Sequence, residues 1–170
     1  MGQNAVYIAL DDSTLDALWQ LDDQPFRDRF LEIEEDDSFE RLDIAKIWDA
    51  LHCTLTGVSA SKPIDGNKLS ESIVGVHPRI YDDEDYSIFV SVIDNSEIEA
   101  ILIALTDFDA EKLEASLDLA TLKKQRVYPD GIWEDEPSQL VAEMDDALCS
   151  IRGFFQSALT AGHHILATIL

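Results

Sequence analysis

The sequence predicts a single α/β domain in which a mixed β-sheet is flanked by helices in a three-layer fold, with an α+β arrangement as the alternative. Predicted strands and helices follow one another along the chain, and the strands carry continuous rather than alternating hydrophobicity. With 170 residues and 46% hydrophobic content, the chain is long enough to bury one core. No internal repeat and no linker interrupts residues 1–170, so a single domain is expected throughout.

The first forty residues predict a strand followed by helical structure. Residues 6–10 form a short apolar run of β-formers, which is typical of a strand buried on both faces. Ser13 and Asp16 have the spacing of a capping box and are expected to open a helix. The apolar positions of residues 22–41 fit either a continued helix or a short strand.

The most clearly defined helix covers residues 43–57. Asp43 is expected to cap its start, and Gly57 is expected to end it in a left-handed conformation. Its apolar positions repeat with a helical period: Ile44, Ile47, Trp48, Leu51 and Leu55. Residues 59–67 are rich in Pro, Gly, Ser and Asn and are predicted to form a loop, and residues 73–76 an edge strand.

The second half of the chain predicts a strand, several helices and a final strand. Residues 87–92 carry branched side chains typical of a second buried strand. Asp94 with Glu97 repeats the capping spacing, and Asp109 opens a shorter helix. The remaining elements are a basic cluster at 123–126, a turn-rich aromatic loop at 128–133, a long helix from about Ser138 that Gly162 ends, and a buried strand at 165–170.

Acidic residues greatly outnumber basic residues in this sequence. Thirty-five Asp and Glu residues against twelve Lys and Arg residues give a net charge of −23. Such a charge repels nucleic acid and anionic membranes, so neither is expected as a partner. No apolar run approaches the roughly 20 residues that span a bilayer, and the start of the chain lacks the basic region of a signal peptide. A cytoplasmic protein is therefore predicted.

Cys53 and Cys149 are the two cysteines of the sequence. Both lie among apolar neighbours in predicted helices, so both are expected to be buried, reduced and unpaired. His52 is adjacent to Cys53, but neighbouring helical residues point about 100° apart, which argues against a catalytic Cys–His pair.

Residues 42–57, with the sequence LDIAKIWDALHCTLTG, carry the most specific motif of the chain. They resemble a helix of the YfbM-like family of uncharacterised bacterial proteins (domain of unknown function 1877). Three further features are similar in order and spacing: an N-terminal strand, the Tyr-Pro-x-x-apolar-Trp loop at 128–133, and a long helix ending in Ala-x-Gly before a short final strand. The resemblance implies a single three-layer α/β domain and a bacterial cytosolic protein, and it implies no activity.

Motifs of well-known chemistry are absent from the sequence. It contains no Gly-rich phosphate loop, no Gly-x-Ser-x-Gly elbow, and no zinc or calcium-loop signature. His163 and His164 are adjacent in a predicted strand and therefore point to opposite faces, which disfavours their binding one metal ion. No metal site and no cofactor are predicted, and the sequence leaves open whether the chain is an enzyme.

Trp48, Asp49 and His52 share the 43–57 helix and support two interpretations. In the functional one, His52 is a general base oriented by Asp49 at i, i+3, with Trp48 in a binding site. In the structural one, Trp48 and His52 belong to the core and have their polar atoms satisfied there.

Tyr128, Asp130 and Trp133 lie on the 128–133 loop and are candidate binding residues, because loops on rigid scaffolds often carry binding residues. The alternative is that Trp133 anchors the loop by filling the edge of the core. A pocket, where one exists, is expected where this loop approaches the 43–57 helix.

The acidic residues concentrate in two stretches. Residues 11–43 hold thirteen acids and three bases, and residues 82–146 hold nineteen acids and four bases. They form either a docking surface or a generic acidic surface that serves solubility or a high-salt habitat. The first functional hypothesis is therefore a non-enzymatic interaction module that docks on a basic protein partner. The alternative is a small-molecule-binding or hydrolytic enzyme with a site near the 43–57 helix and the 128–133 loop; the oligomeric state is left open.

Overall fold

The computed structural model describes residues 2–83 and 86–170. The strands are β1 (Ala5–Leu10), β2 (Arg41–Asp43), β3 (His77–Asp83), β4 (Tyr86–Ile93) and β5 (His164–Ile169). The α-helices are α1 (Asp12–Trp19), α2 (Asp23–Glu35), α3 (Trp48–Thr56), α4 (Lys68–Val74), α5 (Asn95–Leu105), α6 (Ala110–Ser116), α7 (Leu119–Gln125) and α8 (Pro137–Ala161). Two short 3₁₀ helices are η1 (Ala45–Ile47) and η2 (Ile132–Glu134).

The strands form one five-stranded sheet in the order β2-β1-β5-β4-β3. The α/β class and the helical cover of the sheet agree with the prediction, but the expected mixed sheet is wrong in its strand directions. Each of the four pairings within the described residues is antiparallel. The neighbouring strands β1 and β5 are buried on both faces, and this pattern does not distinguish parallel from antiparallel pairing.

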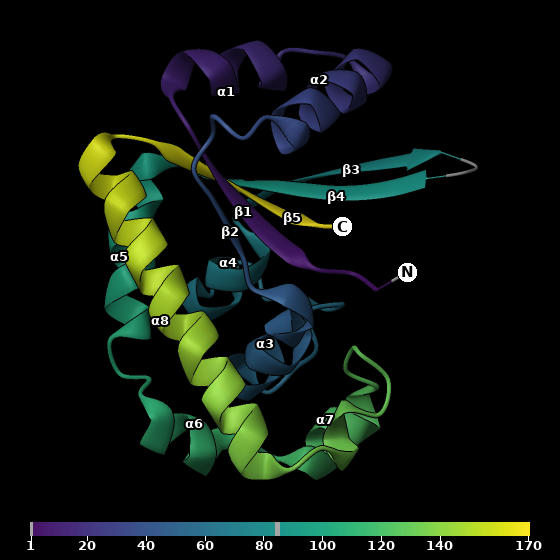
Figure 1. Ribbon diagram of the computed structural model, residues 1–170, viewed down its shortest axis with the longest axis vertical. Coiled ribbons are helices and arrows are strands. Elements are labelled where there is room, and N and C mark those ends of the chain that lie inside the picture. Colours follow the sequence, from purple (N-terminus) through teal and green to yellow (C-terminus); the bar gives the residue numbers. More distant parts are fainter. Residues whose placement is uncertain (1, 84–85) are drawn as a thin grey trace.

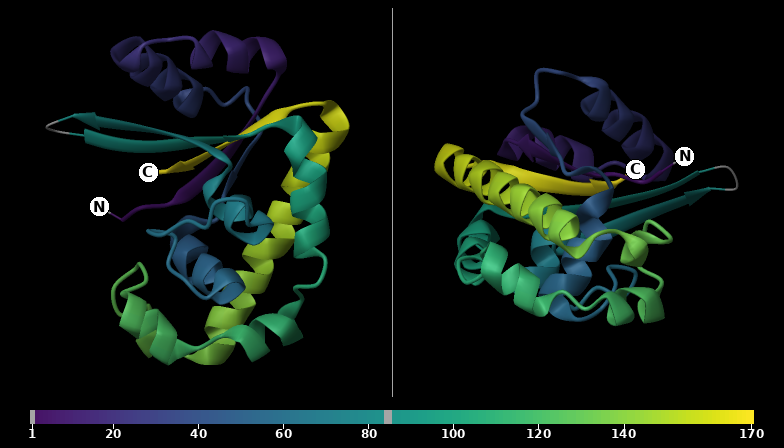
Figure 2. Two further views of the ribbon diagram at one scale, coloured as in Figure 1. Left: turned by 180° about the vertical axis from the view of Figure 1, so that it is seen from behind. Right: turned by 60° about the horizontal axis from the view of Figure 1, so that its bottom comes forward.

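Helices cover the two faces of the sheet unequally. Figure 1 shows α1 and α2 on one face and the other helices on the opposite face, with α8 running along that layer. The view from behind in Figure 2 shows the β3–β4 hairpin running beneath α2, and Arg79 of β3 lies over the ring of Phe26 in that helix. The smaller hydrophobic cluster lies on the face that α1 and α2 cover, and it includes Phe26 and Phe30 of α2. The larger cluster lies on the other face and includes Leu51 and Phe155.

The predicted first strand illustrates how both layers are built. All six residues of β1 are buried. Tyr7 points into the larger cluster, where its hydroxyl donates to Ile73 O at 3.1 Å, while Ile8 points into the smaller one. The two-residue period of a strand therefore serves two cores at once.

Several helix ends follow the sequence signals. Asp94 and Glu97 form a complete capping box at the start of α5, and the Asp109 side chain accepts from Lys112 N at the start of α6. Gly57 and Gly162 end α3 and α8 with φ of 85° and 72°, values in the left-handed region that favours glycine.

The starts of α1 and α3 differ from the prediction. Asp11, not Ser13, is the N-cap of α1, since its carboxylate accepts from Thr14 N. Residues 41–43 pair with β1 as strand β2, so Asp43 belongs to the sheet and does not cap the helix. Ala45 has φ of 52°, which turns the chain into η1, and α3 begins only at Trp48.

The edge strand expected at residues 73–76 is also wrong. Asn67 caps a short helix there, because its side chain accepts from Leu69 N and Ser70 N. Gly75, with φ of 76°, ends this helix, and the chain then enters β3. A four-residue apolar run does not separate a buried helix turn from a strand.

The two cysteines lie in different environments. Both thiols are free, Cys53 is buried and Cys149 is exposed. The expected burial of Cys149 is wrong because α8 buries a stripe that includes Met144, Leu148 and Ile151, and Cys149 lies on the other side of the helix.

Two further expectations concern the surface and the membrane. The acidic stretch at 82–146 lies partly outside the described residues, which do not include 84 and 85. Within residues 2–83 and 86–170, no helix has the length and apolar character required to cross a membrane.

Candidate functional site

Helix α3 and the 128–133 loop meet at a buried carboxylate. Asp49 is only 3% exposed, and it accepts hydrogen bonds from Ala60 N at 2.6 Å, Ser59 Oγ at 3.2 Å and Tyr128 N at 2.8 Å. It therefore joins α3 to two loops that are distant in sequence. The carboxylate is occupied by these donors, which is how buried charges are normally retained.

Trp48 and Tyr128 stack beside this carboxylate and hold the N-terminal segment. Their ring centroids are 5.6 Å apart, with an angle of 27° between the ring planes. Trp48 Nε1 donates to Gln3 O at 3.1 Å, and Gln3 N donates to Tyr128 Oη at 2.6 Å. The chain start, α3 and the 128–133 loop thus form one wall.

His52 is fully buried, and its two ring nitrogens have partners outside this wall. Because the Val58 carbonyl can only accept, His52 Nδ1–H donates to it at 2.8 Å, and Nε2 accepts from Ser70 Oγ–H at 2.7 Å. Burial lowers the pKa of His52, against the opposing effects of Val58 and Asp49. A neutral, enclosed imidazole is suited to holding the loop between α3 and α4 in place.

The other two loop candidates are less integrated. Asp130 is exposed, and Trp133 is half-buried against the larger cluster. The Trp133 Nε1 atom is buried and has no hydrogen-bond partner within the part of the chain that the structure describes. The structure therefore brings together Trp48, Asp49 and Tyr128, and leaves His52, Asp130 and Trp133 apart from them.

Two cavities open on either side of the wall. The first, which we call the acidic groove, has a volume of about 650 Å³ and is lined by residues of β2, η1, η2 and α8. Its carboxylates are Asp43, Asp135, Glu143 and Asp146, and its one basic side chain is Lys46. The second, which we call the Arg126 pocket, has a volume of about 350 Å³ and is lined by Trp48, Tyr128, Ser59, Ser61 and Arg126 among others.

The comparisons with known proteins agree with the resemblance that residues 42–57 carry. The family model described as "Domain of unknown function (DUF1877)" matches residues 1–168. The chain belongs to the DUF1877 family. Protein YfbM of Escherichia coli (strain K12) is 26% identical over 171 residues, covering 100% of this chain and 99% of the relative.

A solved DUF1877-type structure supports the fold. The crystal structure of YfbM from Escherichia coli, a protein of unknown function, has a TM-score of 0.79 and 24% sequence identity, and the match covers 98% of this chain and 99% of that chain. At this identity the likeness shows the fold, and it confirms the α/β architecture expected for the DUF1877 chain.

Some residues of the two cavities could have been identified from the sequence. Glu143 and Asp146 lie three positions apart on one helix and therefore share a face, which is a signal that the spacing provides. Arg126 belongs to the basic cluster, yet its left-handed backbone, with φ of 52°, has no local signature such as Gly or Asn. Both residues of the Ser59–Ser61 pair come from a loop whose path no periodicity describes.

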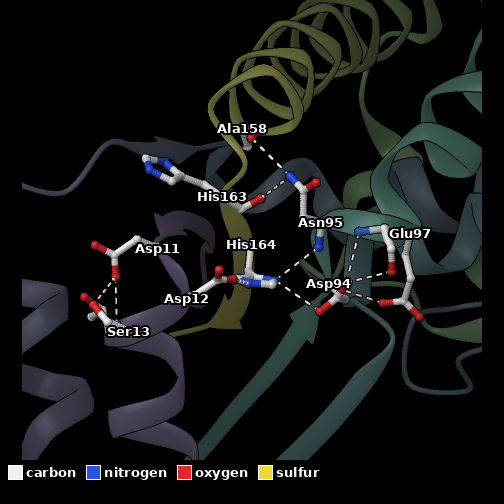
Figure 3. A network of polar contacts seen from close by, with 11 residues as sticks. Asp11, Asp12, Ser13, Asp94, Asn95, Glu97, Ala158, His163 and His164 are labelled. Carbon is white, nitrogen blue, oxygen red and sulfur yellow. Dashed lines mark hydrogen bonds and ion pairs between the residues drawn. The ribbon is translucent and has the colours of Figure 1, made fainter.

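The two adjacent histidines belong to a separate network, shown in Figure 3. His164 is 8% exposed; its Nε2 lies 2.6 Å from Asp12 Oδ1, and its Nδ1 lies 3.2 Å from Asp94 Oδ2. Asn95 Nδ2 donates to His163 O at 2.8 Å. The network ties the start of β5 to the starts of α1 and α5. Within the described residues, no group of three or more His, Cys, Asp or Glu side chains is arranged to hold a metal ion.

Proposed function

We propose that this chain is a non-enzymatic interaction module that binds a basic segment of a partner protein in the acidic groove. The observation that carries the proposal is the composition of the groove, in which four carboxylates face one lysine around a cavity of about 650 Å³. Complementary charge accelerates association and selects among partners.

The carboxylates of the groove differ in how far they are already engaged. Asp43 accepts from Ala45 N and Asn4 Nδ2, so it belongs to the local structure. Asp135 and Asp146 are exposed, and their side chains make no ion pair or hydrogen bond within the described part of the chain. Their charges are therefore available to a cationic ligand.

The floor of the groove suits the stems of basic side chains. Ile44, Ile47 and Ile132 line it together with Pro129 and Ala147. Lysine and arginine bury their methylene groups along apolar surface while their charged ends reach outward. A segment with alternating basic and apolar residues would match both the floor and the rim.

The test uses a fluorescent Arg/Leu peptide as the probe and measures its anisotropy with the full chain. Glu143→Lys with Asp146→Lys reverses two groove charges, and Asp36→Lys with Asp37→Lys makes the same charge change in a turn outside the groove. We expect the groove variant to lose about tenfold or more in affinity, and the turn variant to lose much less, because exposed charges are screened beyond about 8–10 Å.

Equal losses in both variants would contradict a groove-specific site and would leave only non-specific attraction by the net charge. Absence of peptide binding at low salt, together with a melting temperature that rises steeply in molar salt, would favour the high-salt interpretation of the acidic surface. A hydrolytic enzyme is the alternative function, and it would require a base other than His52, because that imidazole is enclosed.

A further inference from the structure

Arg126 stands out among the arginines of this acidic chain. Arg29, Arg41, Arg79 and Arg152 each donate to a carboxylate or to a backbone carbonyl. The Arg126 guanidinium is exposed and, among the described residues, makes no hydrogen bond or ion pair. A chain with net charge −23 has many carboxylates that could pair with it, yet none of those in residues 2–83 and 86–170 forms an ion pair with Arg126.

The backbone conformation of Arg126 is a second unusual feature. It caps α7 in the left-handed region with φ of 52°, where Gly or Asn is the ordinary choice. A side chain other than these is disfavoured there, and such residues concentrate at functional sites. Arg126 is also one of the residues that line the Arg126 pocket.

The other residues that line the Arg126 pocket include both aromatic and hydroxyl-bearing side chains. Trp48, Tyr128 and Phe89 contribute rings, and Ser61 and Ser87 contribute exposed hydroxyl groups. A volume of about 350 Å³ falls in the range of small-molecule pockets, roughly 300–1,000 Å³. Flat rings and one cation favour a ligand that has a flat apolar body and one anionic end.

Asp49 limits the charge that this ligand can carry. Its carboxylate lines the pocket, but three donors already occupy it and it is only 3% exposed. A second negative charge in the ligand would add repulsion from Asp49, whereas a single carboxylate can accept a bidentate pair of hydrogen bonds from a guanidinium.

We infer that the Arg126 pocket binds a small aromatic carboxylate, with the carboxylate on Arg126 and the ring against the aromatic wall. This site is distinct from the acidic groove and takes a ligand of the opposite charge. The two cavities share only the wall between them, because Trp48 and Tyr128 line the pocket while Ile47 and Pro129 line the groove.

The probe is 1-naphthoate, with the uncharged 1-naphthamide as its matched analogue. Binding to the full chain is followed by isothermal calorimetry and by the NMR shift of the Trp48 indole N–H. We expect Arg126→Gln to weaken naphthoate binding by about tenfold or more and to leave the weaker binding of naphthamide unchanged. Lys123→Gln removes the same charge from the same helix outside the pocket, and it should change naphthoate affinity by less than about twofold.

Arg126→Gly separates the ligand role of the side chain from its place in the fold. Glycine accepts the left-handed backbone, so this variant should melt at the same temperature as the parent or higher while losing naphthoate binding as Arg126→Gln does. The proposal is overturned if naphthamide binds as tightly as naphthoate, if Lys123→Gln weakens binding as much as Arg126→Gln, or if saturating naphthoate leaves the Trp48 signal in place. Glu143→Lys with Asp146→Lys should leave naphthoate affinity undiminished, which keeps this test separate from that of the groove.

Discussion

The Asp49 carboxylate accepts the backbone N–H of Tyr128 at 2.8 Å, although 79 positions separate the two residues in the chain. This bond sets the 128–133 loop against α3. Since Trp48 precedes Asp49 and stacks on Tyr128, the same contact aligns the aromatic wall between the two cavities. The position of the wall therefore depends on one buried carboxylate.

Replacing this carboxylate should destabilise the fold. Asp49→Asn places an amide NH₂ where one of the oxygens now accepts, so at least one N–H donor loses its partner. We expect a loss of roughly 2–3 kcal/mol in the free energy of unfolding, measured by urea denaturation. Asp130→Asn, an exposed change in the same loop, should cost less than about 0.5 kcal/mol. A small loss at Asp49 would show that the loop is held by its other contacts.

Trp48 is expected to contribute mainly by packing. It is 8% exposed and belongs to the larger hydrophobic cluster, so Trp48→Ala should cost about 3–5 kcal/mol. Trp48→Phe keeps a ring against Tyr128 but loses the hydrogen bond to Gln3 O, so it should retain most of that stability. Thermal unfolding followed by circular dichroism measures both. If Trp48→Ala kept near-native stability but lost naphthoate binding, the residue would belong to the ligand site rather than to the core.

The stability of the fold should decrease as pH falls below 6.5, because of His52. Burial lowers its pKa from the ordinary value of 6.5, so the unfolded chain takes up a proton at a pH where the folded chain does not. The contribution is fully present above pH 6.5 and is lost as the pH falls from there toward the folded pKa. The pKa values of Asp94 and Asp118 lie below the ordinary 3.8, so they affect only a more acidic range.

Urea unfolding between pH 7.5 and about 5 measures this dependence. His52→Gln should flatten the slope, and His163→Gln, whose ring nitrogens make no hydrogen bond in the described chain, should leave it unchanged. An unaltered slope in His52→Gln would assign the pH dependence to another group.

Local signals predicted the elements that depend on local chemistry. The capping box of Asp94, the glycine end of α3 at Gly57 and the two-faced burial of β1 all involve neighbouring residues. The directions in which the strands pair, and the short strand β2, depend on distant partners and were not predicted. Asp43 is of a residue type that often caps helices, but pairing with Val6 places it in the sheet.

The candidate site also combines features that the sequence predicted with features that depend on distant partners. The sequence indicated that the 128–133 loop and the 43–57 helix would approach each other, and their residues form one wall. It offered Asp49 as the partner of His52, because i, i+3 residues share a helix face. In the folded chain Asp49 is bonded to Ser59, Ala60 and Tyr128, since burial selects whichever loop donors arrive there. The path of a loop is not encoded in the periodicity of a helix.

The two cysteines should differ sharply in their reactivity toward thiol reagents. Cys53 is 3% exposed, and burial, assisted by Asp49 and Asp118, raises the pKa of its thiol to about 11. Little thiolate therefore forms near neutral pH, and the thiolate is the reactive species. Cys149 is exposed on α8 and is open to the reagent.

Labelling of the native protein with iodoacetamide near pH 8, followed by mass spectrometry, should modify Cys149 and leave Cys53 unmodified until the chain is unfolded. Cys149→Ser should abolish native labelling, whereas the matched change Cys53→Ser should leave it in place. Labelling of Cys53 in the native state at a rate close to that of Cys149 would mean that the region around α3 opens frequently. Because α3 carries both Trp48 and Asp49, such opening would also separate α3 from the 128–133 loop. The wall between the groove and the Arg126 pocket would then be lost.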